Sequence, residues 1–330
     1  FGYLGAVLAG FLLTAVPNWT GRLPIVGWRL AALFALWVAG RFAVLFSALV
    51  PPPIAPVLDL AFPVVLGGLI LREILAGQNW RNLIVLALLV VFTLANALFH
   101  AEAMTGGYPA QGVGLRLGLA TAVMMIAVVG GRIVPSFTRN WLVKANRPAR
   151  PAPPMQRFDK LVLLVTMAVL AAWVYRPFAP QTGVALIATG VLHLARQGRW
   201  QPHRTLREPL LWVLHAAYLF IPAGALALGV ASITGAADAA SAQHLWMTGA
   251  IGAMTMAVMT RASLGHTGQA LAASRATVVI YICLFGAVLA RLLSPAHSAM
   301  SHVSGMLWLV AFAGFVAAYG PSLLRPKLGK

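Results

Sequence analysis

Histidine is the residue type in this chain whose chemistry best suits a metal site. The 330 residues include eight histidines, a single cysteine, Cys283, and six acidic residues. Neutral imidazole is a common ligand of both haem iron and copper. The sequence has no P-loop, HExxH, GxSxG or paired-carboxylate motif, so general acid–base hydrolysis has little support. The residue types therefore favour a haem or copper site over a hydrolytic one.

Two histidines belong to stripes with helical spacing. His215, Tyr218 and Pro222 recur at i, i+3 and i+7. A second stripe comprises His244, Met247, Ile251, Met254 and Val258. Imidazole and thioether groups on one helix face could hold copper or cap a haem. Methionine at this spacing more often fills gaps in an apolar core, so each stripe is also compatible with ordinary packing.

Membrane-spanning helices must position these residues. Hydrophobic residues make up 60% of the chain and charged residues 9%, which is too little polar surface for a water-soluble domain of this size. Apolar stretches of about 17–25 residues fit helices, because the strands of a membrane barrel need only about 10 residues. We predict an all-α, polytopic transmembrane helical bundle. Its eleven spans are 1–16, 28–49, 57–76, 82–99, 114–133, 158–176, 183–197, 210–231, 242–262, 274–293 and 301–323.

Basic residues fall mainly on alternate connecting or terminal segments of this bundle. The 20 of the 24 that do so are Arg22, Arg29, Arg72, Arg81, Arg132, Arg139, Lys144, Arg147, Arg150, Arg157, Lys160, Arg196, Arg199, Arg204, Arg207, Arg261, Arg275, Arg325, Lys327 and Lys330. Because cytoplasmic loops are enriched in Lys and Arg, we expect a cytoplasmic C-terminus and Phe1 at the outer face. The net charge of +18 thus indicates topology and contact with anionic lipid, and it gives no support to nucleic-acid binding.

The basic, proline-rich loop 144–157 is predicted to lie in the cytoplasm. It would join two halves of a single transmembrane helical bundle that extends over 1–330. Phe1 is not a start methionine, and the first span is short and lacks signal-peptide features, so we expect the chain to be N-terminally incomplete. One further span upstream would bring the intact protein to twelve.

The topology divides the histidines by depth. The outer ends of spans hold His100, His244, His297 and His302. The inner halves hold His193, His215 and His266, and His203 lies in a basic loop. Ligands of one metal ion must share a depth, and on straight helices His215 and His244 would be roughly 20 Å apart. We predict that at least one of His100, His215, His244 and His266 binds haem iron or copper. The outer pair is favoured, and the inner group would form a second site or the only one.

Arg41 is an ionisable residue near the middle of the second span, where a guanidinium facing lipid would cost about 2.5–3.5 kcal/mol. We predict that it faces a polar partner inside the bundle. A haem propionate, an anionic substrate, a buried carboxylate or backbone carbonyls would each satisfy it. Asp59 and Asn96 are weaker candidates, and Asp59 could cap the span that follows the prolines at 51–53.

Four blocks of sequence are recognisable together. They are FGYLG at 1–5 with GFLLTAVPNWTG at 10–21, GGRIVPSFTRN at 130–140, LHAAY at 214–218 and MTRASLGHTG at 259–268. Jointly they resemble the NnrS family of haem- and copper-containing bacterial inner-membrane proteins. The resemblance covers essentially the whole chain, and the last block is the most specific. It implies a twelve-span bundle, b-type haem and copper, and a role in nitric oxide and nitrosative-stress physiology in denitrifying and related bacteria.

Members of that family typically carry a His-rich segment before the Phe-Gly that opens this chain. By the predicted topology the segment would lie on the outer face beside His100 and His244, which favours an outer metal site. The leading hypothesis is therefore a haem- and copper-binding membrane protein that binds or processes nitric oxide, or protects against it. Catalytic residues and an electron donor cannot be named from the sequence.

Two other functional classes stay open. A cofactor-free, multi-span transporter or permease for a small solute would use Arg41 and other buried polar residues to line a path. A scaffold that stabilises a partner complex is the third. Turnover of nitric oxide would need protons, and the sequence shows no row of inward-facing carboxylates to carry them. Whether the protein is an enzyme is therefore left open.

Overall fold

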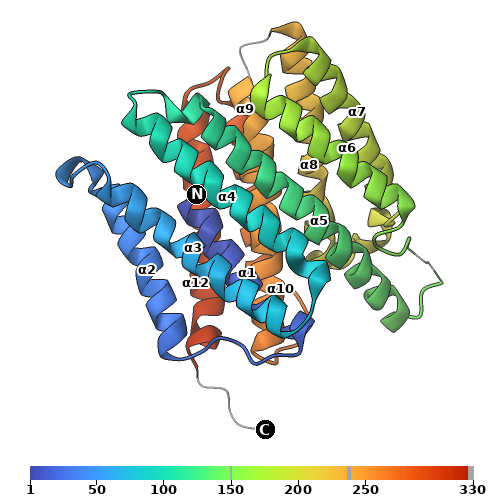
Figure 1. The fold of residues 1–330 in the computed structure, drawn as a ribbon. Coiled ribbons are helices and arrows are strands. Elements are labelled where there is room, and N and C mark those ends of the chain that lie inside the picture. The colour runs from blue at the N-terminus through green and yellow to red at the C-terminus, as the bar shows by residue number, and fades with distance from the viewer. Residues whose placement is uncertain (149–150, 236–238, 326–330) are drawn as a thin grey trace. The chain divides into compact units, whose positions relative to one another are not determined.

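The computed structural model describes residues 1–148, 151–235 and 239–325, and every regular element in these ranges is helical (Figure 1). Eight helical segments of the described chain are long and apolar enough to cross a membrane. The all-α class is therefore confirmed, whereas the number of helices that cross the bilayer stays a prediction. Arg150, Lys327, Lys330 and Asp238 lie outside the described residues.

The first compact unit, Phe1–Ala122, is built from helices that pack around α3. It contains α1 (Gly2–Thr20), α2 (Trp28–Leu45), α3 (Ile54–Ala76), α4 (Leu83–Met104) and the first residues of α5 (Val113–Lys144). α3 packs against α1, α2 and α4, so side chains that α3 points inward can meet partners from three helices.

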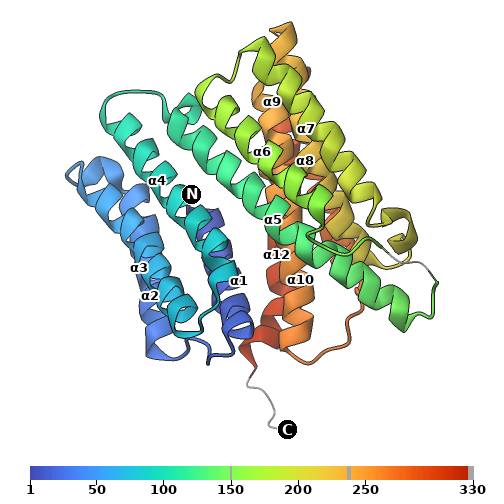
Figure 2. The ribbon, with the colours of Figure 1, turned by 45° about the vertical axis from the view of Figure 1, so that its right-hand side comes forward.

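The second compact unit, Val123–Lys330, is organised around one helix, α8. It contains the rest of α5, then α6 (Arg157–Tyr175), α7 (Pro180–Gly198), α8 (Pro209–Thr234), α9 (Ala239–His244), α10 (Met254–His266), α11 (Arg275–Leu293) and α12 (Ala299–Leu324). α7 packs along α8, and α6 packs on α7; Figure 2 shows these three helices side by side. α8 starts at Pro209, and the Glu208 side chain caps it by accepting the Leu210 N–H.

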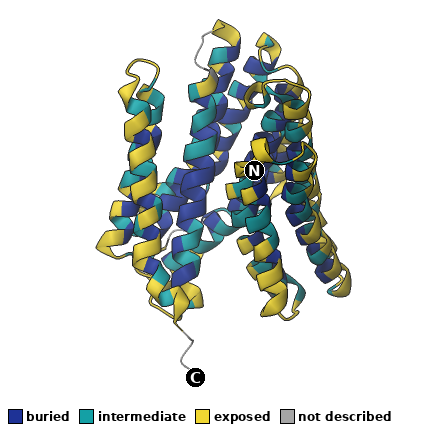
Figure 3. Cartoon of the chain, turned by 90° about the vertical axis from the view of Figure 1, so that its left-hand side faces the viewer, coloured by how far each residue is buried: buried dark blue, intermediate teal, exposed yellow. Residues whose placement is uncertain are grey.

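Large apolar side chains cover much of the outward surface of the helices. Figure 3 shows helices with buried positions on one side and exposed positions on the other. The exposed positions include Phe34, Val65, Leu94, Leu164, Val191 and Leu309. Apolar surface on this scale is costly in water and favourable in lipid, which agrees with a multi-pass membrane protein.

Each of the eleven predicted spans coincides with a helical stretch of the structure, and the ninth differs in kind. Between α9 and α10 the chain forms a π-helix over Leu245–Ala253. The predicted stripe that begins at His244 assumed α-helical spacing, and i→i+5 bonding changes which residues share a face. The single face from His244 to Val258 is therefore wrong, because the helix is wound differently over nine residues.

The 144–157 loop has the predicted bounds, since α5 ends at Lys144 and α6 begins at Arg157. Its described residues are held against the end of α7 and α5. The Ala152 N–H donates to the Arg199 carbonyl at 3.0 Å, and Arg139 donates to the Pro151 carbonyl at 3.1 Å. The division into compact units falls upstream of this loop, inside α5.

Candidate functional site

Asp59 is the centre of a buried polar cluster in the first unit. Its carboxylate pairs with Arg41 of α2 and accepts hydrogen bonds of 2.9 Å from Asn96 Nδ2 and His100 Nε2 of α4. The predicted polar partner of Arg41 is thereby confirmed. Gly40 makes this pairing possible, because a Cβ atom there would lie 3.1 Å from the Asp59 Cα. The two helices therefore approach closely at the ion pair.

Two expectations about this cluster are wrong. Asp59 does not cap α3, since the helix begins at Ile54, so Asp59 lies in its second turn. Arg41 is not at the middle of its helix, because α2 ends at Leu45 and the predicted span had included the separate 3₁₀ turn Ser47–Leu49. A paired Arg41 also removes the reason to read its charge as part of a solute path.

Removing the Arg41 guanidinium is expected to destabilise the first unit. In Arg41→Leu the buried Asp59 carboxylate keeps only Asn96 and His100 as donors, which we expect to cost about 1–3 kcal/mol of unfolding free energy. Arg29→Leu on the same helix is the matched control, because Arg29 is exposed, and its effect should stay within about 0.5 kcal/mol. Thermal unfolding in detergent measures both. Equal effects would contradict the assigned role of the ion pair.

The second unit contains another buried polar cluster, which was not predicted from the sequence. Arg196, which the charge pattern had assigned to a cytoplasmic segment, lies within α7 and is fully buried. Its guanidinium donates to Asp159 Oδ1 at 2.8 Å, to the Ala127 carbonyl at 2.9 Å and to Tyr218 Oη at 2.9 Å. Gly131 of α5 makes room for it, since a Cβ atom there would lie 2.8 Å from Arg196 Cζ.

The sequence contained weak signals for this cluster. Arg196 follows His193 by three residues and so shares its helix face, which a residue in a solvated loop need not do. Asp159 lies at the third position of α6, where its carboxylate also accepts the Gln156 N–H at 3.0 Å as part of a capping box. The Asp159 carboxylate thus both caps α6 and pairs with the buried Arg196. Because capping alone accounts for an acidic residue in the first turn of a helix, the sequence offered no reason to expect the ion pair.

The histidines differ in which ring nitrogen is available. Thr166 Oγ1 donates to the Val162 carbonyl at 2.6 Å, so it must accept from His193 Nε2–H at 2.9 Å. His193 Nδ1 then accepts from Tyr218 Oη–H at 2.9 Å. Both nitrogens of His193 are therefore engaged, and this member of the inner group has none to offer a metal.

His215 has one nitrogen free in the described structure. Thr138 donates to the Val134 carbonyl, so His215 Nε2–H donates to Thr138 Oγ1 at 2.9 Å. The lone pair is on Nδ1, which is buried and has no partner among the described residues. Gln197 holds the same turn of α8 by donating to the His215 carbonyl at 2.6 Å.

The two outer histidines, His100 and His244, differ in which ring nitrogen carries the available lone pair. His100 Nε2–H donates to Asp59, so His100 offers Nδ1. His244 Nδ1 bonds to the Ala240 carbonyl at 2.7 Å, and because a carbonyl only accepts, the proton is on Nδ1 and the lone pair on Nε2. His266 is exposed at the end of α10. His100 belongs to the first unit, and His215, His244 and His266 to the second.

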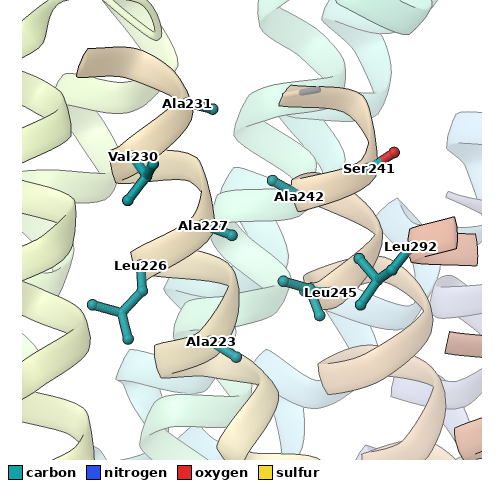
Figure 4. A pocket seen from close by; sticks show the side chains of 9 residues that line it. All are labelled: Ala223, Leu226, Ala227, Val230, Ala231, Ser241, Ala242, Leu245 and Leu292. Carbon is teal, nitrogen blue, oxygen red and sulfur yellow. The ribbon is translucent and has the colours of Figure 1, made fainter. Parts of the chain in front are cut away.

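An apolar cleft of about 540 Å³ lies between α8 and the segment formed by α9 and the start of the π-helix (Figure 4). Its walls are Ala223, Leu226, Ala227, Val230 and Ala231 of α8, Ser241 and Ala242 of α9, Leu245 of the π-helix and Leu292 of α11. His244 stands in the chain between two of these wall residues, Ala242 and Leu245.

The residues that the structure describes contain no group of three or more His, Cys, Asp and Glu side chains able to hold a metal ion. A copper ion, which prefers several nitrogen or sulfur ligands, therefore finds no gathered set of these four residue types among them. A haem needs only one or two protein ligands. Single imidazole donors of the kind that haem uses are present among the described residues.

No curated protein and no solved structure matches this chain. A family model described as NnrS protein matches residues 1–327, which is essentially the whole chain and agrees with the four sequence blocks. On that match, the chain belongs to the NnrS family.

Proposed function

We propose that this protein is a haem- and copper-binding integral membrane protein that binds or processes nitric oxide, or protects the cell against it. The family match over residues 1–327 carries the proposal. The apolar helices support it, because nitric oxide is small, uncharged and soluble in lipid and can reach an intramembrane site without a polar channel. Haem, when bound, supplies an iron coordination position for nitric oxide.

We assign the haem ligand to His244. Metal-binding histidines commonly donate their second ring N–H to a backbone carbonyl or a carboxylate, as His244 does to Ala240. Its Nε2 is the ring nitrogen far from the main chain, where a planar macrocycle meets the least steric interference. The apolar cleft supports the assignment, because its wall includes Ala242 and Leu245, which lie on either side of His244 in the chain.

His100 and His215 suit a smaller metal ion. Each presents Nδ1, which adjoins the Cγ–Cβ bond and its own main chain, so a macrocycle would collide there while a copper ion would not. His100 also has the carboxylate partner that orients many metal-binding imidazoles. We assign no chemical step to copper, because further ligands are not gathered around either residue.

The test is the absorption spectrum of the purified full-length protein. We expect a Soret band in proportion to protein, and a shift of that band when nitric oxide is added. Protein that purifies without haem after expression with ample haem supply would overturn the proposal. In that case solute flux in proteoliposomes would be measured, because the transporter alternative requires it.

The topology of the proposal can be tested with single cysteines. In a Cys283→Ser background, Lys144→Cys and His297→Cys place exposed thiols at opposite ends of the predicted bundle. We expect a membrane-impermeant maleimide to label position 297 in intact cells and position 144 only after the inner membrane is opened. Labelling of position 144 from outside would invert the proposed orientation.

A further inference from the structure

Hydrogen-bond directions in the buried cluster of the second unit are fixed by elimination. Thr166 has one hydroxyl proton and gives it to Val162, so His193 must donate through Nε2 and accept through Nδ1. Arg196 can only donate, so it fills an acceptor position of Tyr218 Oη and leaves the phenol to donate to His193 Nδ1 at 2.9 Å. Tyr218 is therefore a buried phenol whose proton already points at a neutral base.

We propose that Tyr218 is a redox-active tyrosine with His193 as its proton acceptor. In the step, Tyr218 gives one electron to a one-electron oxidant, and its hydroxyl proton moves to His193 Nδ1. The products are a neutral tyrosyl radical, an imidazolium and the reduced oxidant. Nitrogen dioxide is an oxidant of the required class: it is small, soluble in lipid and becomes nitrite. The proposal does not depend on haem binding by His244.

The surroundings favour this step over loss of an electron alone. Oxidation of a phenol without proton transfer would leave a cation radical, which is a far stronger acid than imidazolium, so the proton moves to His193 Nδ1, to which the phenol already donates. With His193 accepting the proton, the new charge stays on an imidazole that keeps its bond to Thr166. The charge of Arg196 is balanced by Asp159, so the phenol does not face an uncompensated cation.

Trp200 is a second oxidisable aromatic residue next to Tyr218. Its ring lies 4.6 Å from the Tyr218 ring, edge to face, and the Arg196 guanidinium lies 5.3 Å from the Trp200 ring centre. Trp200 is the second residue after α7 and follows Arg199, whose side chain is about one-third exposed. Trp200 is itself buried, so its ring is a second oxidisable group in contact with the phenol.

The chain provides a matched comparison in Tyr281. This tyrosine is also buried, but its hydroxyl bonds to Thr260 Oγ1 at 2.6 Å, and none of the described histidines bonds to it. Threonine is too weak a base to take a phenolic proton. If burial alone made a tyrosine oxidisable, Tyr218 and Tyr281 would behave alike.

The experiment oxidises the purified full-length protein with flash-generated tris(bipyridine)ruthenium(III) and records the radical by electron paramagnetic resonance. We expect a tyrosyl spectrum that narrows with ring-deuterated tyrosine, disappears in Tyr218→Phe and persists in Tyr281→Phe. His193→Gln keeps a polar side chain but removes the base, and it should slow phenol oxidation by about 100-fold.

Folding is checked for each variant by size-exclusion chromatography and circular dichroism. A radical that survives Tyr218→Phe, or that is lost equally in Tyr281→Phe, would overturn the proposal. So would an unchanged oxidation rate in folded His193→Gln. Should Tyr218→Phe fail to fold, 3-fluorotyrosine incorporated at position 218 alone must alter the hyperfine pattern of the wild-type radical, and an unaltered pattern refutes the assignment.

Discussion

Arg196→Leu is expected to lower the unfolding free energy of the second unit by about 3–5 kcal/mol, the usual cost of leaving one member of a buried ion pair alone. Asp159, whose side chain is 1% exposed, would lose its close cation, and Tyr218 and the Ala127 carbonyl would each lose a donor. The measurement is the midpoint of thermal unfolding in detergent, together with the yield of monodisperse protein.

Arg199→Leu is the control for that substitution. Arg199 lies 3.9 Å from the same carboxylate, but its side chain is 32% exposed, so its loss should cost about 0–1 kcal/mol. Arg196→Lys should recover only part of the loss, because an ammonium cannot reach three acceptors in the planar geometry of a guanidinium. Similar midpoints for Arg196→Leu and Arg199→Leu would show that the buried pair does not stabilise the fold.

His244→Ala is expected to reduce haem per protein by at least about tenfold, since a loss of only 1.4 kcal/mol in binding free energy has that effect. The reason is the loss of an imidazole that is held through Nδ1–H, which leaves the Nε2 lone pair available to the iron. Haem is quantified by pyridine haemochrome, and copper by mass spectrometry on the same sample. His302→Ala, an exposed position on α12, is the control.

The same assay distinguishes the other candidates. Loss of haem in His215→Ala but not in His244→Ala or His100→Ala would move the site to the inner group. Loss of copper without loss of haem in His100→Ala would support the carboxylate-oriented imidazole as a copper ligand. Haem and copper content could also stay unchanged in all four alanine variants, at His100, His215, His244 and His266. That result would contradict a metal site at these residues and favour the transporter alternative.

The helices could be predicted from sequence because each depends on local information. Length and apolar content mark them, and the start of α6 at Arg157 lies one residue from the predicted start of that span, whereas α5 continues to Lys144, beyond the predicted end of its span at 133. The π-helix over Leu245–Ala253 could not be predicted, because no residue type specifies i→i+5 bonding. Packing is unusually tight there: a Cβ atom at Gly249 would lie 2.5 Å from the Phe220 ring.

The polar clusters show where sequence reasoning stops. The cost of a charge in lipid predicts that Arg41 has a partner, but the identity of that partner depends on which faces of α2 and α3 meet. Asp59 was a candidate cap because it follows three prolines, and Arg196 was counted with the basic residues of a connecting segment because it lies at the end of the predicted span 183–197. In both cases a local role was enough to account for the residue in the sequence. Its actual role depends on a contact with another helix, which the sequence does not specify.

Four helices share the network around Arg196: Ala127 belongs to α5, Thr166 to α6, His193 and Arg196 to α7, and Tyr218 to α8. Apolar helices in lipid can slide along one another at little cost, because one leucine contact resembles the next. Hydrogen bonds between particular atoms do not tolerate such sliding. The axial register of α5, α6, α7 and α8 is therefore fixed by a few polar atoms, and a register shift of one residue in any of the four would leave a buried charge or hydroxyl without its partner.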